Sequence, residues 1–303
     1  MIRNSYRLFR RVFGSLYFLV FINGFLLASL FYFKMEANYE NELFDVIQKS
    51  INSKIRLNDP KDSILIKIMQ TCSDLLGNRA VIFNGSQDLV GFKADFIHPA
   101  SIDLMTAKGE CGSYSLVLAR ILQNYHYPVR IAQMKAYGRY GAHNIIEANI
   151  NSQWIVLDPL FDTYFVTPDK KNLASFNDVK NNWDFYSKQL PSGYDNSYKY
   201  EDVRYTNWDK IPIILPAFKK ILEIVLGKEK TDSISLRVHF LRMYDLYFFI
   251  SLFIYFPILI LTLRNIIKKK LFPRYEMPVT ISNIKRYAMP LLENKGLKKI
   301  IHR

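Results

Sequence analysis

Two long apolar runs without a charged residue lie near the two ends of the chain, at residues 12–33 and 246–263. A hydrocarbon core of about 30 Å needs roughly 20 helical residues, so both runs predict membrane-spanning helices. The first run also allows a cleaved signal peptide. It is longer than the usual apolar segment of such peptides and ends in bulky aromatic residues, which favours a retained anchor. For the second run, the alternative is a buried core helix.

Apolar residues at helical spacing follow the first run. They predict a helical region at residues 36–76, which Asn58-Asp59-Pro60 interrupts and Gly77-Asn78 ends. The apolar triplet at residues 81–83, followed by Asn84-Gly85, predicts a short strand and a turn.

The middle of the chain changes from helical to alternating spacing. Residues 111–123 predict a buried helix, which ends before Pro128. Strands are predicted to start at Val129 and to cover residues 143–150 and 154–157, with the last two joined by a polar turn. A helix packed on an antiparallel sheet is an α+β arrangement.

Two segments between this core and the second apolar run have weaker patterns. Residues 166–210 are rich in Asp, Asn, Lys and Tyr, and we interpret them as an exposed, irregular insert. Residues 211–226 are apolar with two prolines, so they either pack on the core or lie flat on a membrane surface. We favour packing on the core.

The positive charge of the chain lies outside the apolar runs. Four basic residues and no acid precede residue 12, and eleven basic residues against two acids follow residue 263, so the tails carry 13 of the 14 net charges. A nucleic-acid-binding domain would carry its excess charge on the folded body, so we expect no nucleic acid partner. The positive-inside rule instead places both tails in the cytoplasm.

This topology predicts five regions. They are a cytoplasmic basic tail (1–11), a first transmembrane helix (12–33), an extracytoplasmic domain (34–243, core about 100–165), a second transmembrane helix (244–264) and a second basic tail (265–303). We expect an integral protein of a bacterial inner or cell membrane. The C-terminal tail either binds anionic lipid headgroups, which we favour, or docks partners of a membrane complex.

The chain has two cysteines, Cys72 and Cys111, and no cluster of Cys and His at the spacing of zinc ligands. We therefore expect no metal and no cofactor. The two cysteines also allow a disulfide. The setting of Cys111 argues against one, because Gly109-Glu110-Cys111-Gly112 places a thiol among small residues at the start of a helix, where backbone N–H groups favour a thiolate.

Two further residues complete a catalytic set. His143 opens the next strand and Asp158 closes the strand after it. Neighbouring antiparallel strands bring such positions side by side, so a thiol, a base and a group to orient that base are expected at one edge of the sheet.

Residues 100–165 resemble the transglutaminase-like superfamily of papain-like cysteine enzymes. The motifs are Gly109-Glu110-Cys111, Pro128-Val129-Arg130, His143 with Glu147, and Trp154 leading into Asp158-Pro159. The resemblance implies a papain-like core with Cys111 as nucleophile, His143 as general base and acid, and Asp158 as the group that holds the imidazole. The chain departs from the family pattern at Asn144-Ile145 and at His126, positions that affect packing and substrate contacts.

The chemistry implied is acyl transfer through a Cys111 thioester, by hydrolysis, proteolysis or transfer to an amine. The oxyanion is expected to bind the backbone N–H of Cys111 and one more donor, for which Asn84 and Gln87 are candidates. For Arg130, Glu147 and Trp154 we prefer structural roles: Arg130 ties down a loop and Trp154 lies in the core. Tyr137 and Tyr140 either wall the active-site groove or pack within their loop.

Two classes of function remain. The first is a membrane-anchored thiol enzyme that acts outside the cytoplasm on a peptide, protein or other amide-bearing substrate, with the lipid bilayer as its other partner. The second is a non-catalytic binding scaffold in a membrane or envelope assembly that builds a surface polymer. The complete Cys/His/Asp set favours the enzyme, because a scaffold has no use for all three groups.

Overall fold

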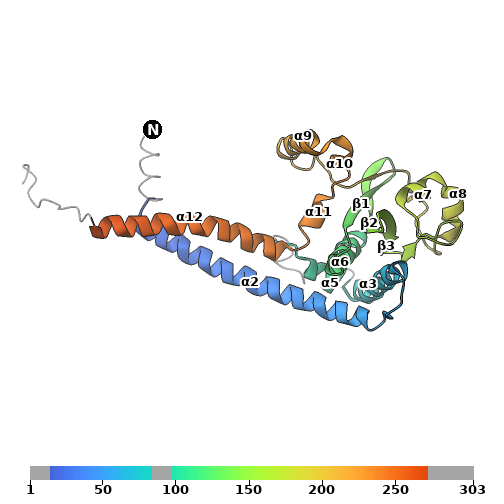
Figure 1. Ribbon diagram of the computed structural model, residues 1–303, viewed down its shortest axis with the longest axis horizontal. Coiled ribbons are helices and arrows are strands. Elements are labelled where there is room, and N and C mark those ends of the chain that lie inside the picture. Colours follow the sequence, from blue (N-terminus) through green and yellow to red (C-terminus); the bar gives the residue numbers. More distant parts are fainter. Residues whose placement is uncertain (1–13, 84–96, 272–303) are drawn as a thin grey trace, which may run out of the picture. The chain divides into compact units, whose positions relative to one another are not determined.

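The computed structural model describes residues 14–83 and 97–271. The chain forms two compact units, one from residues 1–27 and 253–303 and one from residues 28–252. Two helices, α2 (Leu16–Asn52) and α12 (Met243–Leu271), contribute to both units (Figure 1). Each unit is described by itself.

The smaller unit contains the N-terminal part of α2, up to Leu27, and the C-terminal part of α12, from Phe253. Its helices present large apolar side chains such as Phe21, Phe25 and Phe253 at their surfaces, and one polar contact joins them, where Asn23 Nδ2 donates to Thr262 Oγ1 over 2.6 Å. By length and composition, α2 and α12 are both able to cross a membrane, and only 11% of the most apolar window of each is buried. This exposure argues against the alternative of a buried core helix for the second run.

The predicted interruption at Asn58-Asp59-Pro60 is confirmed, since α2 ends at Asn52 and α3 (Lys61–Phe83) begins after it, but α3 extends further than the sequence predicts. The predicted helix stop at Gly77-Asn78 and the strand at residues 81–83 are wrong, because α3 runs through both. Gly77 does not end the helix, because Leu76 before it is buried in the core and Ala80 after it packs against the core. This tertiary packing outweighs the low helix propensity of glycine.

The confirmed α+β core is one helix, α6 (Cys111–Asn124), on a five-stranded antiparallel sheet of order β4-β3-β2-β1-β5. The strands are β1 (Val129–Ala136), β2 (Arg139–Ile150), β3 (Gln153–Asp158), β4 (Thr163–Tyr164) and β5 (Val203–Arg204). Helix α6 and the three central strands were predicted. Strand β2 starts four residues before His143, so His143 lies within the strand instead of opening it.

Both faces of the sheet are buried. Alternate residues of β1 and β2, such as Ile131 and Ile146, join one hydrophobic cluster with α3 and α6, while their neighbours Ala132 and Ile145 join a second cluster on the other face. Successive side chains of a strand point to opposite faces, which explains why these strands lack a polar side.

The segment predicted as an exposed insert covers the second face, so that prediction is wrong. It contains α7 (Phe176–Asn181), α8 (Trp183–Tyr186) and the short 3-10 helix η2 (Ser187–Gln189). Four of its aromatic side chains are buried in the cluster on this face, namely Phe176, Tyr186, Tyr194 and Tyr200. The many Asp, Asn and Lys residues between these aromatic side chains give the segment a polar composition, and for this reason the sequence predicted an exposed segment.

The remaining helices are α5 (Ala100–Thr106), α9 (Ile214–Leu226), α10 (Lys228–Asp232) and α11 (Leu236–His239). Helix α9 has no buried residue, so the favoured prediction that residues 211–226 pack on the core is wrong. Its apolar face is considered below.

Candidate functional site

Cys111 is the first residue of α6. A strained turn between α5 and α6 sets the position of this helix start. Ala107 and Glu110 in this turn have φ angles of +49° and +44°. The backbone N–H of Gly109 donates to Ser113 Oγ (2.8 Å), and Ser113 Oγ donates to the buried carboxylate of Asp103 (2.5 Å). A Cβ at residue 109 would lie 2.7 Å from Ser113 Oγ, so this close approach requires glycine.

His143 and Asp158 come from the neighbouring strands β2 and β3. Ile146 pairs with Leu157 at the end of the β2–β3 ladder, which places Asp158 close to His143 within β2. His143 Nε2 lies 2.6 Å from Asp158 Oδ2, and both side chains are fully buried. The carboxylate accepts a hydrogen bond at Nε2, so it fixes the ring orientation and leaves Nδ1 for proton exchange.

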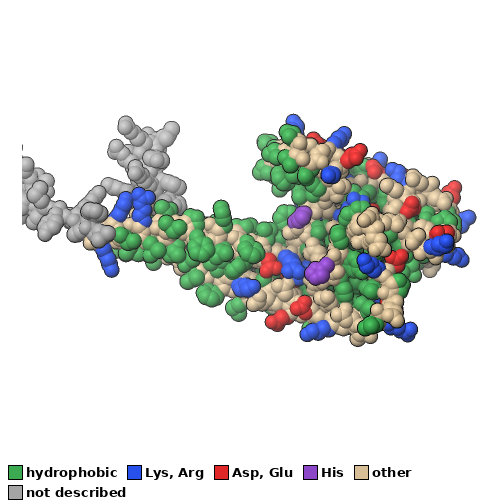
Figure 2. Space-filling view, viewed as in Figure 1, with side chains coloured by type: hydrophobic (Ala, Val, Ile, Leu, Met, Phe, Trp, Pro, Cys, Tyr) green, Lys and Arg blue, Asp and Glu red, His purple; other side chains and the backbone are tan. Residues whose placement is uncertain are grey.

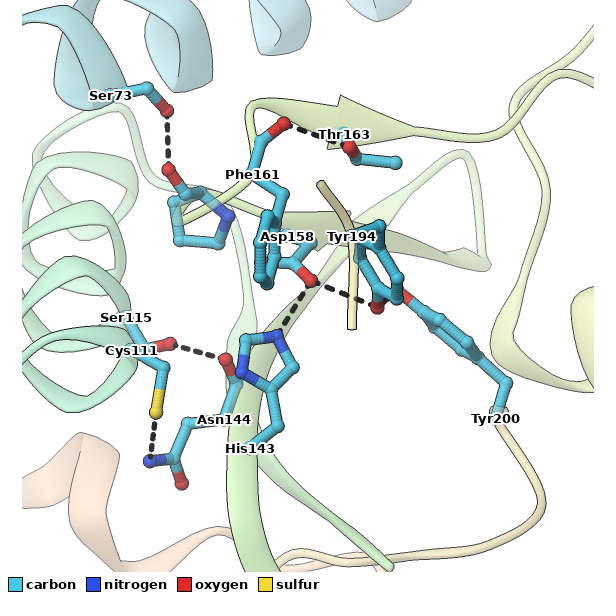
Figure 3. Close-up of polar contacts among 11 residues, drawn as sticks. Ser73, Cys111, Ser115, His143, Asn144, Asp158, Phe161, Thr163, Tyr194 and Tyr200 are labelled. Atoms are coloured by element: carbon cyan, nitrogen blue, oxygen red, sulfur yellow. Dashed lines mark hydrogen bonds and ion pairs between the residues drawn. The ribbon is translucent and has the colours of Figure 1, made fainter. Parts of the chain in front are cut away.

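The structure brings Cys111 to the other side of this imidazole. Figure 3 shows the His143 ring between Asp158 and the side from which Cys111 and Asn144 project. Among the described residues, Nδ1 of His143 has no hydrogen-bond partner of good geometry, and the thiol approaches closely enough for each group to shift the pKa of the other. The three residues predicted from sequence therefore lie in the order thiol, imidazole, carboxylate.

The electrostatics of the pair favour a charged thiolate and imidazolium. Burial raises the pKa of Cys111, but the approach of the His143 ring and its charge, together with the hydrogen bond from Asn144, outweigh burial and lower that pKa below its ordinary value. Burial likewise lowers the pKa of His143, while the contacts with Asp158 and Cys111 raise it to about 9. Both shifts stabilise the ion pair in which Cys111 is the nucleophilic form.

Asn144 also contacts the sulfur. Its Nδ2 donates to Cys111 Sγ over 3.5 Å, and its Oδ1 accepts a hydrogen bond from Arg237 Nη1 over 3.1 Å. Because guanidinium only donates, Arg237 fixes the amide with its N–H₂ group toward the sulfur. Ser115 Oγ donates to the backbone carbonyl oxygen of Asn144 (3.1 Å), and this hydrogen bond holds α6 against β2 at this point.

Aromatic residues from the mispredicted segment enclose the imidazole and the carboxylate. Tyr198 stacks on the His143 ring with a centroid distance of 4.4 Å and an interplanar angle of 7°. The Tyr194 hydroxyl donates to Asp158 Oδ2 over 3.2 Å and lies 3.4 Å from the Tyr200 hydroxyl. These groups exclude water from the His143–Asp158 bond and strengthen it electrostatically.

Sequence reasoning missed Asn144, Arg237, Tyr194 and Tyr198. Asn144 follows His143 directly and was noted only as a departure from the family pattern. The density of tyrosine at residues 194–200 was visible, but nothing local in the sequence pairs those residues with a strand more than thirty positions earlier.

Other candidates lie where they support the fold. Arg130 Nε contacts Glu147 Oε2 over 2.7 Å, and its guanidinium lies over the rings of the half-buried Trp154 and of Tyr205. Tyr140 lies in β2, not in a loop, and its hydroxyl donates to the carboxylate of Asp202 just before β5, so its contact is with a neighbouring element. Tyr137 is 79% exposed.

The remaining sequence alternatives concern the second oxyanion donor, the disulfide and metal binding. Asn84 and Gln87 lie outside the described residues. Cys72 and Cys111 are both free, and Cys72 is fully buried in α3, so the disulfide alternative is wrong. In the described ranges, no three His, Cys, Asp or Glu side chains gather in a way that would hold a metal ion.

In comparisons with known proteins, no family model, no curated protein and no solved structure matches the chain. The interpretation of the site therefore rests on its geometry.

Proposed function

We propose that the chain is a membrane-anchored thiol enzyme of the transglutaminase-like type, which acts outside the cytoplasm on an amide or peptide bond. The observation that carries the proposal is the buried His143–Asp158 contact with Cys111 on the opposite side of the ring. A thiol activated by a base, and a base oriented by a third group, is the arrangement that nucleophilic catalysis needs.

In the proposed reaction, the Cys111 thiolate attacks the carbonyl carbon of the substrate amide and a tetrahedral oxyanion forms. The backbone N–H of Cys111, unpaired within α6 because it belongs to the first turn, is one donor to this oxyanion. The Asn144 amide, already within reach of the sulfur, is the second.

Collapse of this intermediate breaks the C–N bond, and His143 gives its Nδ1 proton to the leaving amine. The acyl group remains on Cys111 as a thioester. His143 then takes a proton from water as the water attacks the thioester, which releases a carboxylic acid and restores the thiol. An amine in place of water gives acyl transfer.

The first test is the rate of alkylation by iodoacetamide as a function of pH, on the full chain in detergent with Cys72→Ala as the background. We expect Cys111 to react rapidly well below the ordinary thiol pKa of about 8.5. His143→Ala is expected to slow the reaction at neutral pH, since it removes the charge that stabilises the thiolate. His126→Asn changes an exposed histidine away from the site and serves as the matched control.

Alkylation of Cys111 no faster than that of an ordinary thiol would overturn the proposal and favour a non-catalytic scaffold. A fast reaction that His143→Ala leaves unchanged would also contradict it, since the imidazole would then have no part in activating the thiol.

A further inference from the structure

Helix α9 exposes most of its apolar face, which touches the rest of its unit where Phe218 contacts the Trp208 ring (centroid distance 6.4 Å). Six side chains on one side of the helix form what we term the α9 stripe, namely Ile214, Ala217, Phe218, Ile221, Ile224 and Val225. Every member of the stripe is exposed, including Ile221 (58%), Val225 (71%) and Ile224 (85%). Figure 2 shows hydrophobic side chains gathered over this helix, which Figure 1 labels.

The opposite side of α9 carries Lys219 and Glu223 together with the half-buried Leu215 and Leu222. Lys219 forms ion pairs with Asp232 (2.8 Å) and Glu223 (3.6 Å). A cleft of about 630 Å³ is lined by Lys219 and Lys220 of α9 and by Arg204 of β5. The helix therefore exposes its more continuous apolar side, whereas a surface helix of a soluble protein turns that side to the core.

An exposed apolar stripe of this length in water is unfavourable, since each large aliphatic or aromatic side chain is stabilised by removal from water. Something outside the domain must cover it. The chain itself indicates what this is, because only sixteen residues, 227–242, separate α9 from α12, one of the two helices able to cross a membrane. Exposed lysines flank the stripe at positions 220, 228 and 230, where they complement anionic lipid headgroups.

We propose that α9 is an interfacial helix that lies in the plane of the bilayer crossed by α2 and α12, with the α9 stripe inserted among lipid chains. The short connection to α12 keeps the helix near the membrane, so insertion costs little additional entropy. The inference does not depend on the chemistry of Cys111.

The test uses the full chain, with Cys72→Ser and Cys111→Ser, reconstituted in vesicles that contain anionic lipid. A nitroxide label is attached at Ile221→Cys or Val225→Cys, and its collisions with oxygen, which partitions into lipid, and with a water-soluble nickel complex are compared. Phe185→Cys on α8 is the matched control, an exposed apolar position outside the stripe (37% exposed).

We expect oxygen collisions to dominate at Ile221 and Val225 and nickel collisions to dominate at Phe185, with the two stripe labels about 5–10 Å deep in the headgroup and acyl boundary. Equal nickel accessibility at all three positions would overturn the proposal. Protection of the stripe labels from both reagents, together with dipolar broadening between labels, would also overturn it and show that a second copy of the chain covers the stripe.

Discussion

Asn144 connects the sulfur of Cys111 to a cation on another element, Arg237 of α11. Its amide lies between Cys111 Sγ and Arg237 Nη1, so it is placed to donate to charge that develops at the substrate carbonyl. We expect Asn144→Ala to lower kcat by about 10²–10³-fold with a small change in KM, because a donor to the transition-state oxyanion is lost. Steady-state kinetics on an amide substrate, once one is identified, provide the measurement.

Asn149→Ala is the control for this prediction, since Asn149 is a half-buried asparagine further along the same strand. Arg237→Gln keeps a hydrogen-bond donor to Asn144 and removes the charge, so we expect a smaller loss of kcat than in Asn144→Ala. Equal activity of Asn144→Ala and Asn149→Ala would exclude Asn144 from the reaction.

The coupled pKa values of Cys111 and His143 predict a bell-shaped dependence of kcat/KM on pH. Activity falls on the acid side as the Cys111 thiolate gains a proton, at a pH below the ordinary thiol pKa because His143 and Asn144 lower it. Activity falls again on the alkaline side near pH 9, where the imidazolium loses the proton it gives to the leaving amine.

Asp158→Asn provides the check on this profile. The substitution removes the carboxylate that raises the His143 pKa, so the alkaline limb is expected to move to lower pH along with a drop in rate. An alkaline limb that stays in place in this variant would mean that another group titrates there.

At the scale of elements, the start of α6 depends on a close approach between Gly109 and Ser113. A methyl group at residue 109 would meet Ser113 Oγ at 2.7 Å, so Gly109→Ala forces the turn away from the helix that presents Cys111. We expect a loss of about 1–3 kcal/mol in stability and a slower alkylation of Cys111. Ser113→Ala alone removes the hydrogen bonds to Gly109 and Asp103 and is also expected to destabilise the turn.

The double variant Gly109→Ala/Ser113→Ala distinguishes a steric cause from a general intolerance of the turn. The obstructing oxygen is absent in it, so its loss of stability should be smaller than the sum of the two single losses in chemical denaturation. Additive losses would contradict the steric explanation.

Elements whose apolar residues recur at regular spacing were predicted well. Elements that depend on contacts between distant parts of the chain were not. Helix α6 and the central strands follow from spacing, and the order of Cys111, His143 and Asp158 along them was sufficient to place the three side chains together. The end of α3 was missed because Leu76 and Ala80 pack on the core on either side of Gly77, and this packing carries the helix past the glycine. The aromatic cover of the second sheet face was missed because its contacts have no local period.

At the scale of the whole molecule, the direction of insertion decides in which compartment Cys111 works. Helices α2 and α12 are long and apolar enough to span a bilayer, and basic residues follow α12 in the sequence while others precede α2. The positive-inside rule then predicts that both tails lie in the cytoplasm and residues 34–243 lie outside it.

Labelling of intact bacterial cells with a membrane-impermeant maleimide tests this topology in a chain that carries Cys72→Ser and Cys111→Ser. Lys188→Cys, at an exposed position beside α8, is expected to react in intact cells, whereas a cysteine added after Arg303 is expected to react only after lysis. The reverse pattern would place the thiol in a reducing cytoplasm and would remove extracytoplasmic substrates from the proposal. Replacing Lys268, Lys269 and Lys270 with glutamine should weaken the preference of the chain for this orientation. These lysines lie close to the second span, and basic charge near a span fixes its orientation.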